Sequence, residues 1–163
     1  MACLYCTPEW LEESAKMYRG SPHYQETLKK VTTRILYRVN AEPEWGIDAD
    51  IIFGADVTNG ALNELRFYNE SEAKEKADFI MAASPQEWKL ILRKEHKFLT
   101  DFMLGKVKLE QGSKVGVLGL APYADVFIDA VTQVSLQFQD ELNPQQVDEY
   151  RQYASQFRST LGI

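Results

Sequence analysis

Apolar and polar residues alternate along residues 47–57, and this alternation predicts a half-buried strand. The apolar positions of the segment share one face, and three aspartates and a glycine lie on the other. Side chains of a strand repeat every two residues, so one face is buried and the other is solvated. Shorter runs of strand-forming residues predict four further strands, at 34–39, 62–68, 78–83 and 106–110.

The dipeptide Asn59-Gly60 follows the first of these segments and is typical of a hairpin turn. We expect a three-residue loop from Thr58 to Gly60, with a bulge. This register places Phe53 opposite Leu65, so that apolar side chains meet on one face. A two-residue loop would instead place Phe53 opposite Arg66, which is an unfavourable pair on an apolar face.

Capping residues followed by proline mark the beginnings of four segments. Ser, Thr and Asn accept hydrogen bonds from the free N–H groups of a helix start, and proline is well tolerated at the first helical position. The four sites are Thr7-Pro8, Ser21-Pro22, Ser84-Pro85 and Asn143-Pro144. Glu87 lies three residues after Ser84 and completes a capping-box pattern. The expected helices span 8–18, 22–32, 85–94, 96–104, 114–134 and 144–160.

The order of these elements indicates an α+β fold in a single domain, residues 1–163. Strands linked by a hairpin favour a five-stranded antiparallel sheet, covered on one face by helices. Residues 115–134 form an apolar run without lysine or arginine, but Pro122, Asp125 and Asp129 interrupt it. Acidic residues in the centre of a membrane span are unfavourable, so we expect a buried helix of a soluble protein there.

Composition and charge favour an ordinary globular protein. The chain is 45% hydrophobic and 26% charged, with a formal net charge of −6. This acidic balance excludes a general nucleic-acid binder, which needs a basic surface. No secretory signal peptide is recognisable, and we expect a cytoplasmic protein. Two cysteines are too few for a disulfide framework.

Three groups of residues could carry chemistry, and each also has an ordinary structural explanation. Cys3 and Cys6 could bind a metal or undergo redox chemistry, but other ligands are few and the pair lies near the chain end. His96 has no nucleophile signature beside it and is interpreted as a surface or capping residue. Asp125 and Asp129 share a helix face, either as an acid–base pair or as its solvated side. We expect no catalytic residue, no metal site and no cofactor.

Apolar residues crowd two helical segments, 98–104 and 115–131. Either an ordinary core or the walls of a ligand cavity accounts for this crowding. Residues 86–108 hold six lysines and arginines but only three acidic residues. Such a basic patch beside apolar helices either meets an anionic membrane surface or is a solvated helix face.

Two stretches, 77–81 and 102–109, resemble the sterol carrier protein type-two family. The shared features are an Ala-Asp pair opening a strand and Phe102 followed, after two residues, by Gly105-Lys106, an apolar residue and a lysine. The resemblance covers residues 32–120 and points to a bacterial relative of that family. It implies a five-stranded antiparallel sheet with helices over one face, and between them an apolar tunnel for sterols, fatty acids or fatty acyl-CoA.

On this resemblance, the domain core spans about residues 22–120, and residues 121–163 form a C-terminal helical extension. We interpret the protein as a non-catalytic carrier of an apolar, lipid-like ligand in an internal cavity. The residues expected to line this cavity are Ile51, Phe53, Phe67, Phe98, Phe102, Met103, Leu118, Phe127, Ile128 and Val131. Expected partners are the lipid and, transiently, an anionic membrane surface, but no nucleic acid.

Two alternatives stay open at this point. The first is a protein-interaction or dimerisation module with a filled core. The second is an enzyme that uses Asp125, Asp129 or His96.

Overall fold

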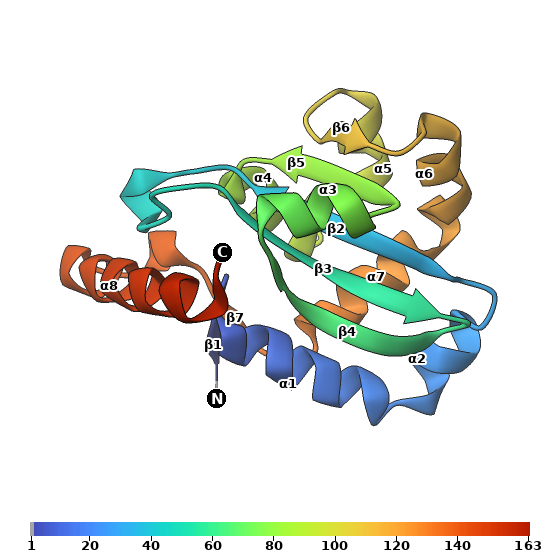
Figure 1. The fold of residues 1–163 in the computed structure, drawn as a ribbon, viewed down its shortest axis with the longest axis horizontal. Coiled ribbons are helices and arrows are strands. Elements are labelled where there is room, and N and C mark those ends of the chain that lie inside the picture. The colour runs from blue at the N-terminus through green and yellow to red at the C-terminus, as the bar shows by residue number, and fades with distance from the viewer. Residues whose placement is uncertain (1) are drawn as a thin grey trace.

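Five strands form the central sheet, in the order β4-β3-β2-β5-β6 (Figure 1). The computed structural model describes residues 2–163. The strands are β2 (Thr33–Val39), β3 (Ile51–Thr58), β4 (Ala61–Tyr68), β5 (Phe79–Ala83) and β6 (Lys108–Gln111). Neighbouring strands are antiparallel except β2 and β5, which run parallel. The five strands and the α+β class are confirmed, but the sheet is mixed rather than purely antiparallel.

The parallel pair depends on helix α3 (Glu70–Lys76), which the sequence analysis did not predict. This helix takes the chain from the edge strand β4 back to β2, so that β5 enters the sheet in the same direction as β2. Asn69 caps it by accepting a hydrogen bond from the backbone N–H of Glu72 at 2.8 Å. Ala73 and Ala77 pack in one cluster with sheet residues Leu36, Ile52, Tyr68 and Ile80. One short helix therefore covers part of the sheet face that was expected to be free of helices.

The other helices begin close to their expected positions. They are α1 (Pro8–Arg19), α2 (Pro22–Thr27), α4 (Pro85–Leu92), α5 (Phe98–Met103), α6 (Lys114–Leu120), α7 (Ala124–Thr132) and α8 (Pro144–Leu161). Short 3-10 turns are η1 (Pro43–Trp45), η2 (Ala121–Tyr123) and η3 (Gln139–Glu141). The side chains of Thr7, Ser84 and Asn143 accept N–H bonds at their helix starts, whereas that of Ser21 does not. Two short strands that were not predicted, β1 (Cys3–Leu4) and β7 (Leu136–Gln137), pair in parallel.

Two helices are shorter than the sequence pattern suggests. The expected helix at 114–134 divides into α6, η2 and α7 around Pro122, because proline lacks the N–H of the helical ladder and clashes with the preceding turn. The expected helix at 22–32 ends early because the chain turns there before it enters β2. The backbone N–H of Val31 donates to the carbonyl oxygen of Leu28 at 2.8 Å in this turn.

The hairpin between β3 and β4 has a two-residue loop rather than the expected three. Asn59 and Gly60 both have positive φ, at 47° and 82°, as a tight turn of this handedness requires. The expected bulge is present, but it lies within β4 and adds one residue to that strand. Phe53 therefore pairs with Phe67, and the expected pairing with Leu65 is wrong by two positions. Because side chains alternate along a strand, a register error of two residues keeps the apolar side chains on the same face.

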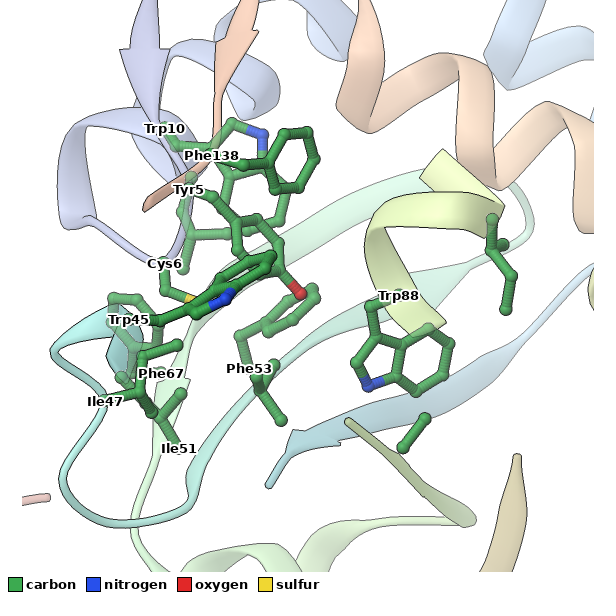
Figure 2. Packing of buried hydrophobic residues seen from close by; sticks show 14 of the residues in the cluster. Tyr5, Cys6, Trp10, Trp45, Ile47, Ile51, Phe53, Phe67, Trp88 and Phe138 are labelled. Carbon is green, nitrogen blue, oxygen red and sulfur yellow. The ribbon is translucent and has the colours of Figure 1, made fainter. Parts of the chain in front are cut away.

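The main core lies between one sheet face and the helices (Figure 2). The Trp10 ring is 5.1 Å from both the Tyr5 and the Phe53 rings, measured between centroids. Tyr5 also contacts Phe138, with centroids 4.9 Å apart. The core thus contains residues from the N-terminal segment, the sheet and the C-terminal region together.

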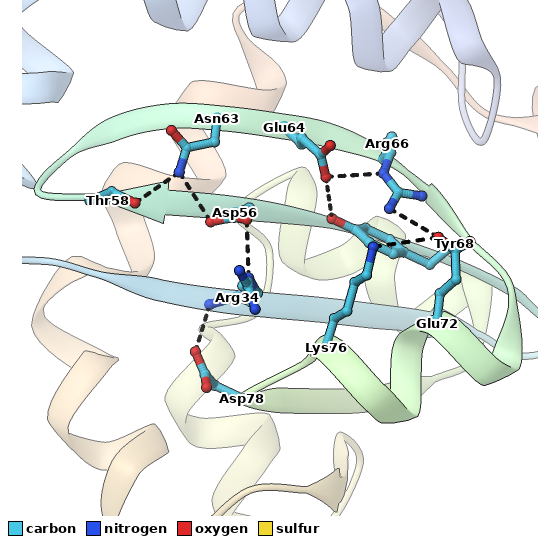
Figure 3. A network of polar contacts seen from close by, with 10 residues as sticks. All are labelled: Arg34, Asp56, Thr58, Asn63, Glu64, Arg66, Tyr68, Glu72, Lys76 and Asp78. Carbon is cyan, nitrogen blue, oxygen red and sulfur yellow. Dashed lines mark hydrogen bonds and ion pairs between the residues drawn. The ribbon is translucent and has the colours of Figure 1, made fainter.

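A polar network covers the opposite face of β2, β3 and β4 (Figure 3). Arg34 Nε donates to Asp56 Oδ2 at 3.0 Å, and the backbone N–H of Arg34 donates to Asp78 Oδ2 at 2.9 Å. Farther along the same face, Arg66 Nη2 donates to Glu72 Oε2 at 3.2 Å. This face is charged where it is open and is covered by α3 elsewhere, so a site for an apolar ligand has to lie on the other face of the sheet.

Candidate functional site: an apolar cavity

A cavity of about 100 Å³ lies between the sheet and helices α1, α4, α5, α6 and α7. Strand residues form its floor, namely Ile35, Tyr37, Phe53, Ala55, Val57, Leu62, Leu65 and Met81. Helix residues and Tyr5 form its walls, the helix residues being Ser14, Tyr18, Trp88, Ile91, Leu92, Phe98, Val117, Leu120, Ala124, Phe127, Ile128, Ala130 and Val131.

Strand and helix periods bring these side chains to one place. Strand β3 contributes every second residue from Phe53 to Val57, because alternate side chains of a strand share a face. Helix α7 contributes Ala130 and, at the spacing of one helical face, Ala124, Phe127, Ile128 and Val131. The cavity is therefore a consequence of the same apolar pattern that predicts the two layers.

Hydroxyl groups are the main polar groups on the cavity wall. Among residues 2–163, no charged side chain lines the cavity. The Tyr18 hydroxyl donates a hydrogen bond to the carbonyl oxygen of Gly60. The hydroxyls of Tyr5 and Ser14 are buried and have no hydrogen-bond partner in the described part of the chain. Burial raises the pKa of Tyr37 well above the usual value of a phenol, so its hydroxyl stays protonated.

Five of the ten residues expected from the sequence line this cavity, and five do not. Those on the wall are Phe53, Phe98, Phe127, Ile128 and Val131. Ile51, Phe67 and Phe102 are buried in other parts of the core, whereas Met103 and Leu118 are exposed on the surface. Phe67, for example, stacks on Phe157 with ring centroids 5.5 Å apart.

Sequence reasoning did not identify the cavity residues contributed by the N-terminal region. Ser14 and Tyr18 are four residues apart on α1, on the face that also carries Trp10. This spacing is visible in the sequence. The position of α1 over the sheet is not visible there, because it depends on contacts with distant parts of the chain.

A second cluster of functional groups, Glu87, His96 and Asp101, lies between α4 and α5. His96 Nδ1 is 2.9 Å from Asp101 Oδ2 and 3.1 Å from Glu87 Oε1. Hydrogen bonds with Glu87 and then Asp101 raise the pKa of His96 above its usual value. One ligand atom from each of the three residues lies within 4.8 Å of the others, so the group could hold a metal ion. The hydrogen bonds of His96 to both carboxylates already explain why the three side chains lie together. The Glu87 side chain faces His96, and only the Ser84 half of the expected capping box forms.

The other sequence candidates have ordinary surroundings. Cys6 is buried, and burial raises the pKa of its thiol, which makes it a weak nucleophile. Asp129 Oδ1 pairs with Lys94 Nζ at 2.5 Å, and Asp125 is exposed one turn earlier on the same helix. Both aspartates therefore lie outside the cavity, on the polar side of α7.

The helical segment Lys114–Thr132 is long and apolar enough to cross a membrane, by length and composition alone. Only 11% of the most apolar 18-residue stretch in this segment is buried. The expectation of a buried helix is therefore wrong. Parts of α6 and α7 cover the cavity, and much of the rest of their surface is open to solvent.

No family model matches the sequence, and no curated protein is similar to it. Solved structures, however, share its fold. A solution structure of a conserved hypothetical protein from Thermus thermophilus, described as a candidate sterol carrier protein, is 21% identical with a TM-score of 0.67. The alignment covers 80% of this chain and 90% of that one.

Two further structures carry the name sterol carrier protein 2. A crystal structure of sterol carrier protein 2 is 22% identical, with a TM-score of 0.62 over 77% of this chain and 92% of that one. The apo form from Yarrowia lipolytica is 13% identical, with a TM-score of 0.52 over 76% of this chain and 87% of that one. At such low identities the likeness shows the fold alone. The chain has the fold of sterol carrier protein 2.

Proposed function

We propose that this protein binds and carries an apolar, lipid-like ligand without catalysing a reaction on it. The observation that carries the proposal is the uncharged cavity between the sheet and helices α1 and α4–α7. Apolar pockets of this kind, with a few polar groups, are typical of small-molecule binding sites. The proposed ligands are fatty acids, fatty acyl-CoA and sterol-like molecules, and the names of two structural relatives, which mention sterols, support the last of these. We place the protein in the cytoplasm.

The cavity has to enlarge before it can hold a long-chain ligand. An engineered protein cavity of about 150 Å³ binds benzene, which is much smaller than a lipid. The cavity of this protein, at about 100 Å³, is smaller still. The α6–α7 segment is suited to move, because it is mostly unburied and Pro122 interrupts it. In this proposal Phe53, Phe98 and Phe127 contact the ligand in the cavity as it stands. Ile51, Phe67, Phe102, Met103 and Leu118 contact it only if the cavity extends beyond the present walls.

Exchange with a membrane is part of the proposal, through a surface that we call the α5–α6 face. Its apolar members are Leu99, Met103, Leu104, Val115 and Leu118, which are 40–79% exposed. Its cationic members are Lys97, Lys106, Lys108 and Lys114, none of which forms an ion pair within residues 2–163. Exposed apolar side chains between unpaired lysines are complementary to an anionic bilayer. The same helices hold Phe98 and Val117 on the cavity wall, so the face lies beside the ligand site.

Native mass spectrometry and ligand titration test the proposal. Protein purified without denaturation should retain a lipid, or should take up a fluorescent fatty acid or sterol with a change in the emission of Trp88. A bulky Ala124→Phe variant should fill the cavity and lose uptake, because Ala124 lines it. The control is Ala121→Phe, in the same segment but outside the lining, which should keep uptake.

If native mass spectrometry shows only the ligand-free mass, and neither the fatty acid nor the sterol is taken up, the proposal is wrong. In that case, gel filtration and light scattering would test the remaining interpretation, a dimerisation module with a filled core.

A further inference from the structure

A strand and a helix lie lengthwise along the apolar cavity and define its long axis. Strand β3 lines the cavity from Val57 to Phe53, which is about 13 Å of strand. Helix α7 lines it from Ala124 to Val131, which is about 10 Å of helix. The cavity therefore has two ends, and the contacts of helix α1 show which residues lie at each.

Helix α1 spans the distance between the two ends. At one end, the Tyr18 hydroxyl donates a hydrogen bond to the carbonyl oxygen of Gly60, in the turn that follows β3. At the other end lies Trp10, about two helical turns earlier in α1. Its Nε1 donates to the carbonyl oxygen of Val131 at 2.9 Å, and its ring is 5.1 Å from the Phe53 ring, measured between centroids. Phe53 and Val131 therefore mark the same end of the cavity.

Tyr5 closes the end that Trp10 marks. Its ring is 5.1 Å from the Trp10 ring and 4.9 Å from the Phe138 ring, measured between centroids. Tyr5 lines the cavity although it is fully buried, so the space narrows to nothing at this residue. Ile51 precedes Phe53 on the same face of β3, and it is buried in the core outside the cavity. The floor of the cavity therefore stops at Phe53, beside Tyr5 and the rings behind it (Figure 2).

Hydrogen bonds from the C-terminal region hold Tyr5 in this position. The backbone N–H of Tyr5 donates to the carbonyl oxygen of Gln137 at 2.9 Å, and Gln139 Nε2 donates to the carbonyl oxygen of Tyr5 at 2.6 Å. The Tyr150 hydroxyl donates to the carbonyl oxygen of the next residue, Cys6, at 2.9 Å. These bonds fix the backbone on both sides of the ring, so this end is rigid, in contrast to the α6–α7 segment.

We propose that Tyr5 determines the length of the hydrocarbon chain that this protein accepts, because the end of the chain stops against its ring. The inference rests on the proposed function and adds a specificity-determining residue to it. A chain that lies along β3, with its tail toward Phe53, buries one more methylene group for each added carbon until it reaches Tyr5. Each carbon beyond that length stays outside the cavity and adds no affinity.

A series of saturated fatty acids, from hexanoic to hexadecanoic acid, tests this proposal by calorimetry on the full chain. All members carry the same carboxylate, so differences among them report chain length alone. For the wild type, affinity should rise about fourfold per carbon, as expected for one buried methylene group, and then stop rising at a break point. Tyr5→Ala empties the space of the ring and should move the break point by about two carbons or more.

Two further variants separate the end wall from a general loosening of the core. Tyr5→Leu removes less volume, so it should stay folded and should move the break point in the same direction by less. It decides the test if circular dichroism shows that Tyr5→Ala is unfolded. Leu36→Ala is the matched control, because Leu36 is fully buried on the opposite face of the sheet, in the cluster that includes α3. It should lower the melting temperature and keep the break point of the wild type.

Two results would overturn the inference and leave lipid carriage standing. One is an affinity that rises through the whole series in the wild type, and the other is a break point that is the same in the wild type and the folded Tyr5 variants. Failure of every fatty acid in the series to bind, together with no uptake of a fluorescent sterol, overturns the carrier function itself.

Discussion

The indole Nε1 of Trp10 donates a hydrogen bond to the carbonyl oxygen of Val131 at 2.9 Å. The bond joins α1 to the last turn of α7, and both helices form cavity walls. Trp10 is fully buried, so its ring also fixes the distance between the two helices. This contact limits how far α7 can move when a ligand enters.

Trp10→Phe should therefore loosen α7. We expect a loss of about 2–3 kcal/mol in the free energy of unfolding, from the lost bond and the volume left empty. Urea unfolding measures this loss, and stopped-flow fluorescence should show faster ligand uptake. Trp45→Phe is the control, since Trp45 is buried in the same core but does not line the cavity. A similar loss of stability without faster uptake is expected there, and equal uptake rates in the two variants would contradict the role of Trp10.

Glycine is required at position 54, where β3 lies close to β2. A Cβ atom at Gly54 would be 2.4 Å from the carbonyl oxygen of Ile35 and 2.7 Å from the Cα of Leu36. Both are backbone atoms that cannot move independently, so Gly54→Ala should destabilise the protein by about 2–4 kcal/mol. Gly119→Ala is the contrast, because a Cβ there meets open space in α6. It should stabilise the helix by up to about 1 kcal/mol, and thermal unfolding of both variants measures the difference.

Stability should depend on pH through His96. Its pKa is raised in the folded protein by Glu87 and Asp101, so its contribution is full below the unfolded value of 6.5 and is lost as pH rises through the folded value. The pKa of Glu87 is also raised, by burial and then by Asp101, so the contribution of Glu87 to stability is likewise lost as pH rises. The melting temperature of the wild type should exceed that of His96→Gln most at pH 6, and the gap should narrow toward pH 9.

His23→Gln is the control, because His23 forms no ion pair in the part of the chain that the structure describes. Its melting temperature should follow the wild type at every pH. A constant gap between the wild type and His96→Gln across this range would show that the cluster does not titrate as described.

The α5–α6 face should bind anionic vesicles. The full chain should sediment with vesicles of phosphatidylcholine and phosphatidylglycerol in equal parts, and much less with phosphatidylcholine alone. Lys106→Gln/Lys114→Gln should weaken binding by about 2 kcal/mol, since each lysine near such a surface contributes about 1 kcal/mol. Met103→Gln/Leu104→Gln should weaken it as well, by removing exposed apolar side chains.

Exposed residues elsewhere provide matched controls for this experiment. Met17→Gln and Leu161→Gln remove apolar side chains of similar exposure on α1 and α8. Lys30→Gln/Lys74→Gln removes two exposed lysines outside the α5–α6 face. These variants should bind vesicles like the wild type. Self-association through the α5–α6 face, without vesicle binding, would show that the partner of this face is a second copy of the chain and not a membrane.

The hydrophobic pattern predicts which face of the β3–β4 hairpin is buried, but not which residues are opposite. Phe53 and Leu65 both line the cavity, as the alternation requires. Phe53 pairs with Phe67 because β4 holds one extra residue. A bulge within a strand leaves no turn residue in the sequence, so its position could not be inferred.

The cavity wall shows the same limit. Apolar crowding identified Phe127, Ile128 and Val131, but Met103 and Leu118 are just as apolar and face solvent. Periodicity tells which residues share a helical face, whereas tertiary packing decides which face covers the sheet. The contribution of α1 depends on contacts such as Trp10 with Val131, which are 121 positions apart and have no local signal.

The parallel pairing of β2 with β5 also bears on the order of folding. Strands β2, β3 and β4 are consecutive and pair through short connections, whereas Ile35 meets Phe79 only after 44 residues have been closed into a loop. Closing the longer loop is entropically less favourable, so the β2–β4 meander should form first and β5 should join it later. The helices from α4 onward follow β5 in the chain. The cavity walls formed by α4, α5, α6 and α7 should therefore pack on a sheet whose first three strands are already paired.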